Sequence, residues 1–164
     1  MNVIHEETQK FNVMMGMLIV VSFVIIGAYL AITWSRGEIY QLPSYLIVML
    51  VVILIFDLFF IINFYQLKTV VTDDKLIFGF GVLKRKVKLE EIEDVIVEKF
   101  QFNKYMGYGI RTGKDRSVGY IARAGHGIRV KVRNKKDFFI TSENADRLKT
   151  MIDTAARKTA GISH

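Results

Sequence analysis

The sequence predicts a membrane protein with an α-helical hairpin in the bilayer, followed by a β-rich domain that ends in an α-helix. Hydrophobic residues make up 51% of the 164 residues although 24% are charged, so the two kinds of residue belong to different regions. The 25 residues between Lys10 and Arg36 include no charged side chain. From Gln66 onward, apolar and polar residues alternate, which is typical of half-buried strands.

Two stretches are long and apolar enough to cross a bilayer, which takes about 20 helical residues. They cover about residues 11–34 and 43–65, and Pro43 stands at the expected start of the second helix. Residues 1–10 are predicted as a cytoplasmic N-terminal segment. A signal peptide is a poor description of the first stretch, because the stretch is too long and follows Glu6 and Glu7.

The distribution of Lys and Arg predicts the orientation, because cytoplasmic flanks of membrane helices are enriched in these residues. The loop between the two stretches contains only Arg36, whereas the outer flanks contain Lys10, Lys68, Lys75, Lys84 and Arg85. Both termini are therefore predicted in the cytoplasm, in a multi-pass protein of the cell membrane.

Asp57 is the acidic residue within the second stretch, where an ionised carboxylate costs about 2.5 to 3.5 kcal/mol on insertion scales. In an antiparallel hairpin its depth matches that of residue 20. We therefore expect a protonated Asp57 to hydrogen-bond Ser22 or a symmetry-related copy, with Gly27 and Ala31 as a point of close helix approach. The functional alternative is a proton or ion path, for which the sequence offers no series of companion acids.

Seven strands and one helix are predicted between residues 66 and 158, and residues 159–164 are predicted as a flexible tail. Residues 89–94 are predicted as a helical turn, Phe100 and Phe102 as core residues beside Ile96, and Ser142 as the N-cap of the final helix. The strand ranges are 66–72, 75–80, 82–89, 94–102, 108–112 continuing through 118–122, 128–133 and 137–141.

Three segments of this region resemble a known family. They are GYGIR at 107–111, GHGIRVKV at 125–132 and FFITSENADRL at 138–148. They resemble the bacterial pleckstrin-homology-like (PH-like) domains, in particular small membrane proteins in which two spans precede such a domain, although those proteins usually have proline where this chain has Ala145. The resemblance implies a seven-stranded bent antiparallel sheet or barrel capped by a C-terminal α-helix, and binding of lipids, peptides or other proteins.

A set of lysines is the candidate ligand-binding site. Eukaryotic relatives that bind phosphorylated lipid headgroups use a lysine on one strand and a basic pair on the next, and Lys75 followed by Lys84 and Lys86 is similar. Lys88 completes the set. Each lysine near an anionic leaflet contributes about 1 kcal/mol, which is redundant for anchoring beside two spans. The alternative interpretation is a solvated basic face that only sets topology.

The sequence offers few motifs for other functions. The chain has no cysteine and three scattered histidines, so no metal site or cofactor is predicted. The glycines at 107, 109 and 113 miss the dinucleotide-binding fingerprint, and no nucleophile motif is present. Nucleic-acid binding is not expected despite a pI of about 9.6, because membrane topology explains much of the basic charge.

The predicted function is therefore that of a non-enzymatic integral membrane protein. It presents a cytoplasmic PH-like binding module at the anionic inner leaflet, for recognition of a lipid headgroup, a peptide or a protein. The alternative is a self-assembling membrane scaffold, a homo-oligomer without a small ligand. A transporter component is the third alternative.

Overall fold

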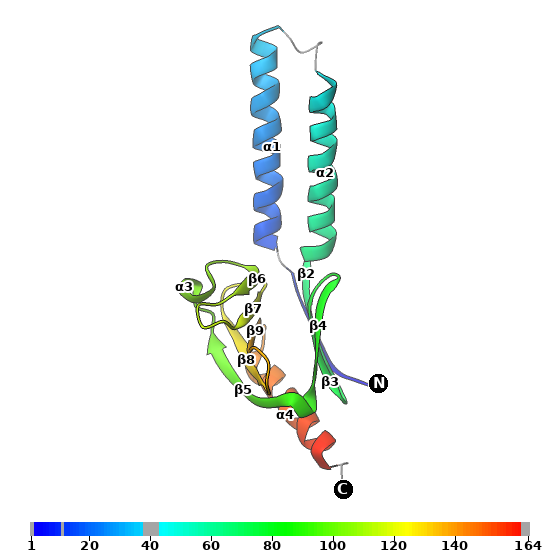
Figure 1. Cartoon of the computed structure of the whole chain (residues 1–164), viewed down its shortest axis with the longest axis vertical. Helices are drawn as coiled ribbons and strands as arrows, with labels where there is room; N and C mark the ends of the chain where they lie inside the picture. The colour runs from blue at the N-terminus through cyan, green and yellow to red at the C-terminus, as the bar shows by residue number, and fades with distance from the viewer. Residues whose placement is uncertain (1, 11, 38–42, 162–164) are drawn as a thin grey trace. The chain divides into compact units, whose positions relative to one another are not determined.

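The computed structural model of the chain describes residues 2–10, 12–37 and 43–161, which belong to two compact units (Figure 1). The helical unit is Asn12–Tyr65, and the β-rich unit combines Met1–Phe11 with Gln66–His164. The β-rich unit is thus built from two segments, one that precedes the helical unit in the sequence and one that follows it.

The helical unit contains α1 (Asn12–Ser35) and α2 (Ser44–Phe64), close to the two predicted stretches. Many of their large apolar side chains point outward, for example Phe23 at 72% exposure and Ile62 at 68%. Two buried polar side chains bond to their own helix: the Thr33 hydroxyl donates to the Leu30 carbonyl (3.0 Å), and the Asn63 amide donates to the Phe59 carbonyl (2.9 Å). Such self-bonding suits a helix surrounded by lipid.

Within the described part of the chain, α2 alone is long and apolar enough to count as a candidate membrane span. Its apolar window is entirely unburied, unlike the core helix of a soluble protein. The described apolar part of α1, Ile19–Ser35, is shorter than the length of such a span. Length and composition therefore support α2 as a membrane span. They do not support α1, the other predicted span.

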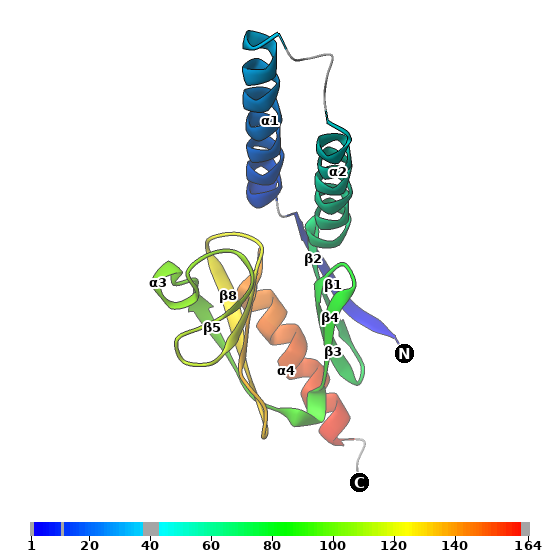
Figure 2. The ribbon, with the colours of Figure 1, turned by 45° about the horizontal axis from the view of Figure 1, so that its top comes forward.

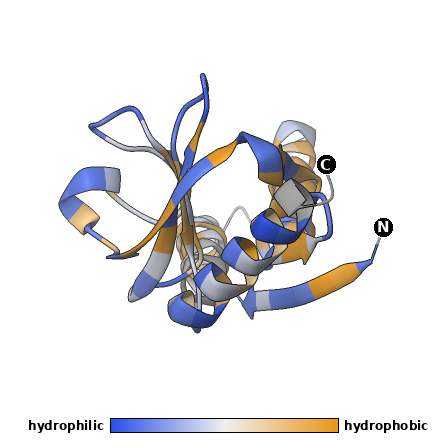
Figure 3. Ribbon diagram, turned by 90° about the horizontal axis from the view of Figure 1, so that it is seen from below, coloured by the Kyte–Doolittle hydropathy of each residue, from blue (hydrophilic) through white to orange (hydrophobic). Residues whose placement is uncertain are grey.

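The first sheet has four antiparallel strands in the order β1-β2-β3-β4. Its strands are β1 (Val3–Lys10), β2 (Gln66–Thr72), β3 (Lys75–Phe80) and β4 (Leu83–Lys88). Lys10 of β1 lies opposite Gln66 of β2. Strand β1 was not predicted, because Val3 and Ile4 are followed by an almost wholly polar run (Figure 3).

The second sheet has five strands in the order β5-β8-β9-β7-β6. Its strands are β5 (Ile92–Lys99), β6 (Gly109–Thr112), β7 (Val118–Ile121), β8 (His126–Val132) and β9 (Phe138–Thr141). A 3₁₀ turn, η2 (Leu89–Glu91), leads into β5 and confirms the first half of the helical turn predicted over residues 89–94, whereas residues 92–94 already belong to β5. Neighbouring strands are antiparallel except β7 and β9, which are parallel.

Nine strands in two sheets replace the predicted single seven-stranded antiparallel sheet or barrel. One additional strand is β1. The other arises because residues 108–122 are not one run: the Gly113 N–H donates to the Ser117 carbonyl (2.7 Å), Arg116 takes a φ of 65°, and the chain reverses. The parallel pair was missed because alternation along one strand does not specify its distant neighbour.

The prediction for residues 94–102 was wrong at its end. The chain leaves β5 before Phe100 and enters a short helix, α3 (Phe102–Tyr105). Phe102 is consequently 58% exposed and Ile96 38% exposed, whereas Phe100 packs against the buried cluster of Tyr105, Ile121 and Phe139.

The C-terminal helix α4 (Ala145–Gly161) packs against strands of both sheets (Figure 2). Leu148 and Ile152 on its inner face are fully buried. The N-cap is Asn144 instead of the predicted Ser142, since the Asn144 side chain accepts the Arg147 N–H (3.0 Å). The helix extends three residues into the predicted tail, and residues 162–164 lie outside the described residues.

The β1 strand is tied to this end of the fold by side chains. The Ser142 hydroxyl donates to Glu7 (2.7 Å), and the backbone N–H of Glu143 donates to the same carboxylate (2.6 Å). Gln9, only 1% exposed, donates to the Thr141 carbonyl (2.6 Å). These bonds connect residues that precede α1 with residues near the C-terminus.

Candidate functional site

The outer face of the first sheet carries six lysines, here called the basic outer face. Because paired residues of neighbouring strands point to the same side, the register fixes its members. Leu67, Phe80 and Leu83 are aligned on the inner side, so the lysines at alternate positions project outward. The basic outer face consists of Lys10, Lys68, Lys75, Lys84, Lys86 and Lys88.

All four lysines of the predicted ligand-binding set lie on this face, and Lys75 lies opposite Lys88 on the neighbouring strand. Lys10 and Lys68 were missed as members of the site. They were identified in the sequence only as topology-setting charges. The position of Lys10 depends on the unpredicted pairing of β1 with β2, whereas Lys68 is aligned with Lys84 through Gly79 of β3.

Several of these charges are already compensated. Lys68 pairs with Glu6 (2.7 Å), Lys75 with Asp74 (3.0 Å) and Lys88 with Glu90 (2.9 Å). The hydrogen bond from Lys75 lowers the pKa of Asp74, and the hydrogen bond to Glu90 raises the pKa of Lys88.

Lys84 and Lys86 are different. Both are exposed on β4, and neither forms an ion pair with any residue that the structure describes. These two ammonium groups are therefore the uncompensated charges of the predicted set, and they are the ones available to an external anion.

Gly79 explains how β4 reaches its position. It lies opposite Lys84 with a φ of 147°, and a Cβ at this position would collide with the backbone of Leu83 and Lys84. Only glycine allows this close approach. Lys84 consequently has no side chain beside it from β3.

Arg85, between the two free lysines, points to the inner side of the sheet. Its guanidinium hydrogen-bonds the hydroxyl of Tyr120, and burial raises the pKa of that tyrosine. The basic residue that interrupts the apolar pattern of β4 is thus used in packing the two sheets together.

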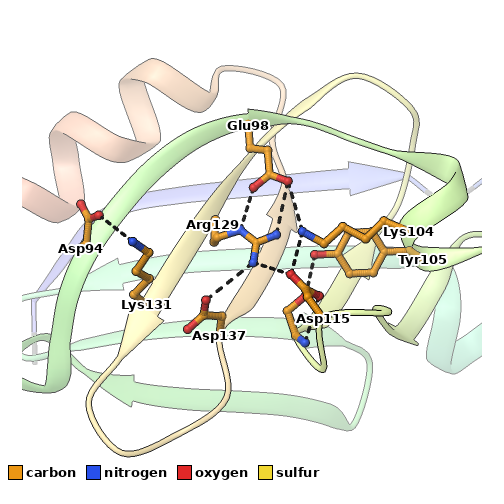
Figure 4. Close-up of polar contacts among 9 residues, drawn as sticks. Asp94, Glu98, Lys104, Tyr105, Asp115, Arg129, Lys131 and Asp137 are labelled. Atoms are coloured by element: carbon orange, nitrogen blue, oxygen red, sulfur yellow. Dashed lines mark hydrogen bonds and ion pairs between the residues drawn. The ribbon is translucent and has the colours of Figure 1, made fainter.

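A second charged cluster lies around Arg129 of β8, which is only 9% exposed (Figure 4). Its Nε lies 2.7 Å from Glu98 of β5, and its Nη1 lies 2.9 Å from Asp115 in the β6–β7 turn. Lys104 of α3 joins Asp115 at 2.8 Å, and Asp137 lies 3.6 Å from the guanidinium. Three acids and two cations thus hold β5, β8, α3 and two loops together.

Tyr105 extends this network into the apolar interior. Because the Ser117 hydroxyl donates to Asp115 (2.6 Å), Tyr105 donates its own proton to Ser117 (2.9 Å). Burial raises the pKa of Tyr105 to about 12. The ring lies against Gly119, where a Cβ would come within 2.9 Å of it. Every charged group here has an internal partner, so the network is structural.

The structure brings Ser22 and Asp57 together in the helical unit. Both line a cleft of about 420 Å³ between α1 and α2, whose other walls are apolar. No hydrogen bond joins the two side chains within the described residues, and a bond from Asp57 to a symmetry-related copy stays a prediction. The remaining lining residues are Ile19, Phe23, Ile26, Leu54, Leu58 and Ile61.

Gly27 and Ala31 lie outside this cleft. Both are exposed, and a Cβ at position 27 would meet nothing within 4 Å. They are therefore not a point of contact between α1 and α2, and any close approach at this face would involve another molecule.

In the described ranges, no group of three or more His, Cys, Asp or Glu side chains is arranged to hold a metal ion.

Comparison with known protein families, curated proteins and solved structures gave no match to this chain. A functional assignment therefore depends on the residues and geometry of the chain itself.

Proposed function

We propose that the chain is an integral membrane protein in which α1 and α2 both cross the cell membrane and hold a PH-like domain at the inner leaflet. The domain acts as a recognition module for anionic lipid headgroups, a peptide or a protein. It requires no catalytic residue, metal, cofactor or nucleic acid for this role.

The pairing of β1 with β2 is the observation that carries this proposal. β1 precedes α1 and β2 follows α2, yet Lys10 lies opposite Gln66 in one sheet. Two paired strands lie on the same side of a bilayer, so the chain between them crosses it an even number of times. If α2 crosses, α1 is the helix that makes the second crossing.

The charge distribution supports the cytoplasmic side for the β-rich unit. Residues 66–164 contain 21 Lys and Arg against 12 Asp and Glu, a net charge of +9. Basic residues beside membrane helices favour the cytoplasm. Both termini then lie in the cytoplasm.

The basic outer face supports a role at an anionic surface. Lys84 and Lys86 together contribute roughly 2 kcal/mol beside an anionic leaflet. Two spans already make attachment effectively irreversible, so this energy serves to orient the domain or to select a headgroup. Charged side chains on an edge strand also discourage pairing with other chains, and that role needs no ligand.

The PH-like assignment is supported by the β-rich composition of the unit, its two sheets and its C-terminal helix. The nine strands and the parallel pairing of β7 with β9 depart from the seven-stranded antiparallel pattern. The membrane topology above does not depend on this assignment.

Single cysteines test the topology, because the chain contains none of its own. We expect an impermeant maleimide to label Arg36→Cys on intact cells, and to label His5→Cys and Lys86→Cys only after permeabilisation. Labelling of positions 5 and 86 from opposite sides would exclude an even number of crossings. Labelling of both positions from outside would show that the orientation is the reverse of the one proposed.

A self-assembling scaffold is the second candidate, favoured by the open Gly27 and Ala31 face of α1. Small residues at this spacing allow two helices to approach closely. If copies assemble here, Gly27→Cys should form a disulfide-linked dimer in native membranes, whereas Ile25→Cys, on the opposite face of α1 and also exposed, should not.

A further inference from the structure

The tip of the β3–β4 hairpin exposes two large apolar side chains, whereas most apolar side chains of the β-rich unit are buried. The two strands are joined by the two-residue turn of Gly81 and Val82. Gly81 has a φ of 44°, and glycine is favoured at the first position of such turns. Hairpin turns usually carry polar residues, yet Val82 is 77% exposed, the most exposed large hydrophobic side chain in the described chain. Leu83 beside it is 47% exposed.

The register places this tip at one particular end of the first sheet. Leu67 of β2 lies opposite Phe80 of β3, and Phe80 lies opposite Leu83 of β4. Neighbouring strands are about 4.8 Å apart, so the tip lies within about 10 Å of the start of β2. Figure 1 shows the tip beside the β2 label. Gln66 begins β2, and only Tyr65 separates it from α2.

The chemistry next to the tip suits a lipid surface. The apolar pair is followed directly by Lys84 and then, after Arg85, by Lys86, two lysines of the basic outer face that form no ion pair with the described residues. Interfacial membrane segments combine apolar side chains at the acyl boundary with basic groups among the headgroups. The long stem of a lysine also lets its ammonium group reach that layer.

We infer that Val82 and Leu83 insert into the interfacial layer of the leaflet from which α2 emerges, while Lys84 and Lys86 contact anionic headgroups. The inference rests on the proposed function, since it needs α2 in the bilayer. The tip then forms a contact additional to the chain connections at Lys10 and Gln66, and it fixes the orientation of the domain on the membrane.

The apolar surface of this hairpin is small, two adjacent side chains at a turn, which favours lipid over a protein groove as its occupant. Its backbone is also well defined, because Gly79 lets β4 lie tightly against β3. A tip of this kind enters a membrane without a conformational change.

The test uses the full chain reconstituted in vesicles of phosphatidylcholine and phosphatidylglycerol, with one environment-sensitive fluorophore on an introduced cysteine. The positions are Val82→Cys at the tip, Lys136→Cys in the exposed loop between β8 and β9, and Ile55→Cys on α2. We expect spin-labelled lipids to quench the fluorophore at 55 strongly, at 82 clearly, and at 136 several-fold less than at 82. Aqueous iodide should show the reverse order.

The outcomes separate this inference from the proposed function. Strong lipid quenching at 55 with equal, weak quenching at 82 and 136 would overturn the inserted tip and leave the spans in place. Absence of lipid quenching at 55 would overturn both. Shielding of position 82 from both lipid quencher and iodide would mean that a protein covers the tip, which also overturns the inference.

Two background substitutions exclude an artefact of the fluorophore itself. Leu83→Asp should move the fluorophore at 82 toward the aqueous behaviour of position 136. Joint Lys84→Glu and Lys86→Glu substitution should reduce lipid quenching in these anionic vesicles and have less effect in pure phosphatidylcholine. No response to either background would show that the fluorophore inserts by its own hydrophobicity, and the inference would fail.

Discussion

The two units of the chain arrange their apolar side chains in opposite ways. In the helical unit, Phe23 and Ile62 lie outside, whereas Thr33 and Asn63 are buried and bond to their own helices. In the β-rich unit, side chains such as Phe139 are fully buried, and the lysines of the basic outer face lie outside. The difference is the one expected if, as proposed above, the helical unit lies in hydrocarbon and the β-rich unit lies in water.

The comparison extends to the polar groups inside each unit. In the described residues, no buried side-chain nitrogen or oxygen lacks a hydrogen-bond partner. The helices meet this requirement with local bonds, whereas the β-rich unit uses bonds between distant segments. Substitutions that remove one partner therefore test the two arrangements separately.

The largest loss of folding stability is expected from disrupting the ion-pair network around Arg129 in the β-rich unit. Arg129→Met leaves the carboxylates of Glu98 and Asp115 without their guanidinium, and loss of one partner from a buried ion pair costs about 3 to 5 kcal/mol. Urea unfolding of the full chain in detergent micelles, followed by the β-sheet circular dichroism, measures the loss. Arg123→Met is the control, since the exposed pair of Arg123 with Glu143 contributes about 1 kcal/mol at most. Equal losses in the two variants would contradict a buried network.

The opposite change is expected in the helical unit, where an acidic side chain is replaced by an apolar one. Asp57→Leu should make membrane insertion of α2 more favourable by about 3 kcal/mol, because an aspartate is costly near the bilayer centre. A glycosylation-based insertion assay measures this difference. Asn63→Leu, close to the end of α2, is the control and should change insertion less. No change for Asp57→Leu would mean that Asp57 does not face hydrocarbon.

A smaller loss of stability is expected when the side-chain contact between β1 and the rest of the β-rich unit is removed. Gln9→Ala removes the buried amide that binds the Thr141 carbonyl, and an unsatisfied buried polar group costs about 1 to 3 kcal/mol. Thr8→Ala, on the outer side of the same strand, should be close to neutral. The same urea experiment compares them. If the two variants were equally stable, β1 would not belong to the β-rich unit as described.

The smallest change in the free energy of unfolding is expected at alkaline pH, where Tyr105 titrates. Burial raises the pKa of Tyr105 to about 12, so the folded state keeps this proton after the unfolded state, with a pKa of 10.0, has lost it. The stabilisation is complete below pH 10 and is lost as the pH rises toward 12, with about 1.4 kcal/mol gone at pH 11. Unfolding between pH 9 and 11 measures the slope, which Tyr105→Phe should reduce. An unchanged slope in the variant would assign the alkaline loss to other groups.

The elements that follow from local patterns could be predicted from the sequence. Both helices, the first strands after α2 and the helical turn at 89–91 lie close to the predicted ranges, because apolar content and alternation are properties of neighbouring residues. The placement of Lys84, Lys86 and Lys88 on one face follows from the same alternation.

The features that depend on distant partners were not predictable in this way. β1 has few apolar residues and becomes a strand only beside β2, and Gln9 finds its acceptor 132 residues later in the chain. The parallel β7–β9 pair and the network around Arg129 likewise join segments that have no local relationship. The exposed tip at Val82 could have been suspected from a valine at a turn, but its position relative to β2 required the register of three strands.

The position of β1 has a consequence for biosynthesis. This strand leaves the ribosome before either helix, and it stays without a partner until the helices and then β2 have been translated. In a membrane-inserted chain, Gln9 and Thr141 meet only if both helices have entered the bilayer and returned the chain to its starting compartment. A chain with one helix misplaced keeps an unpaired strand and an incomplete sheet, the kind of exposed edge that promotes aggregation and degradation. Under the proposed topology, completion of the first sheet thus reports that both helices were inserted correctly.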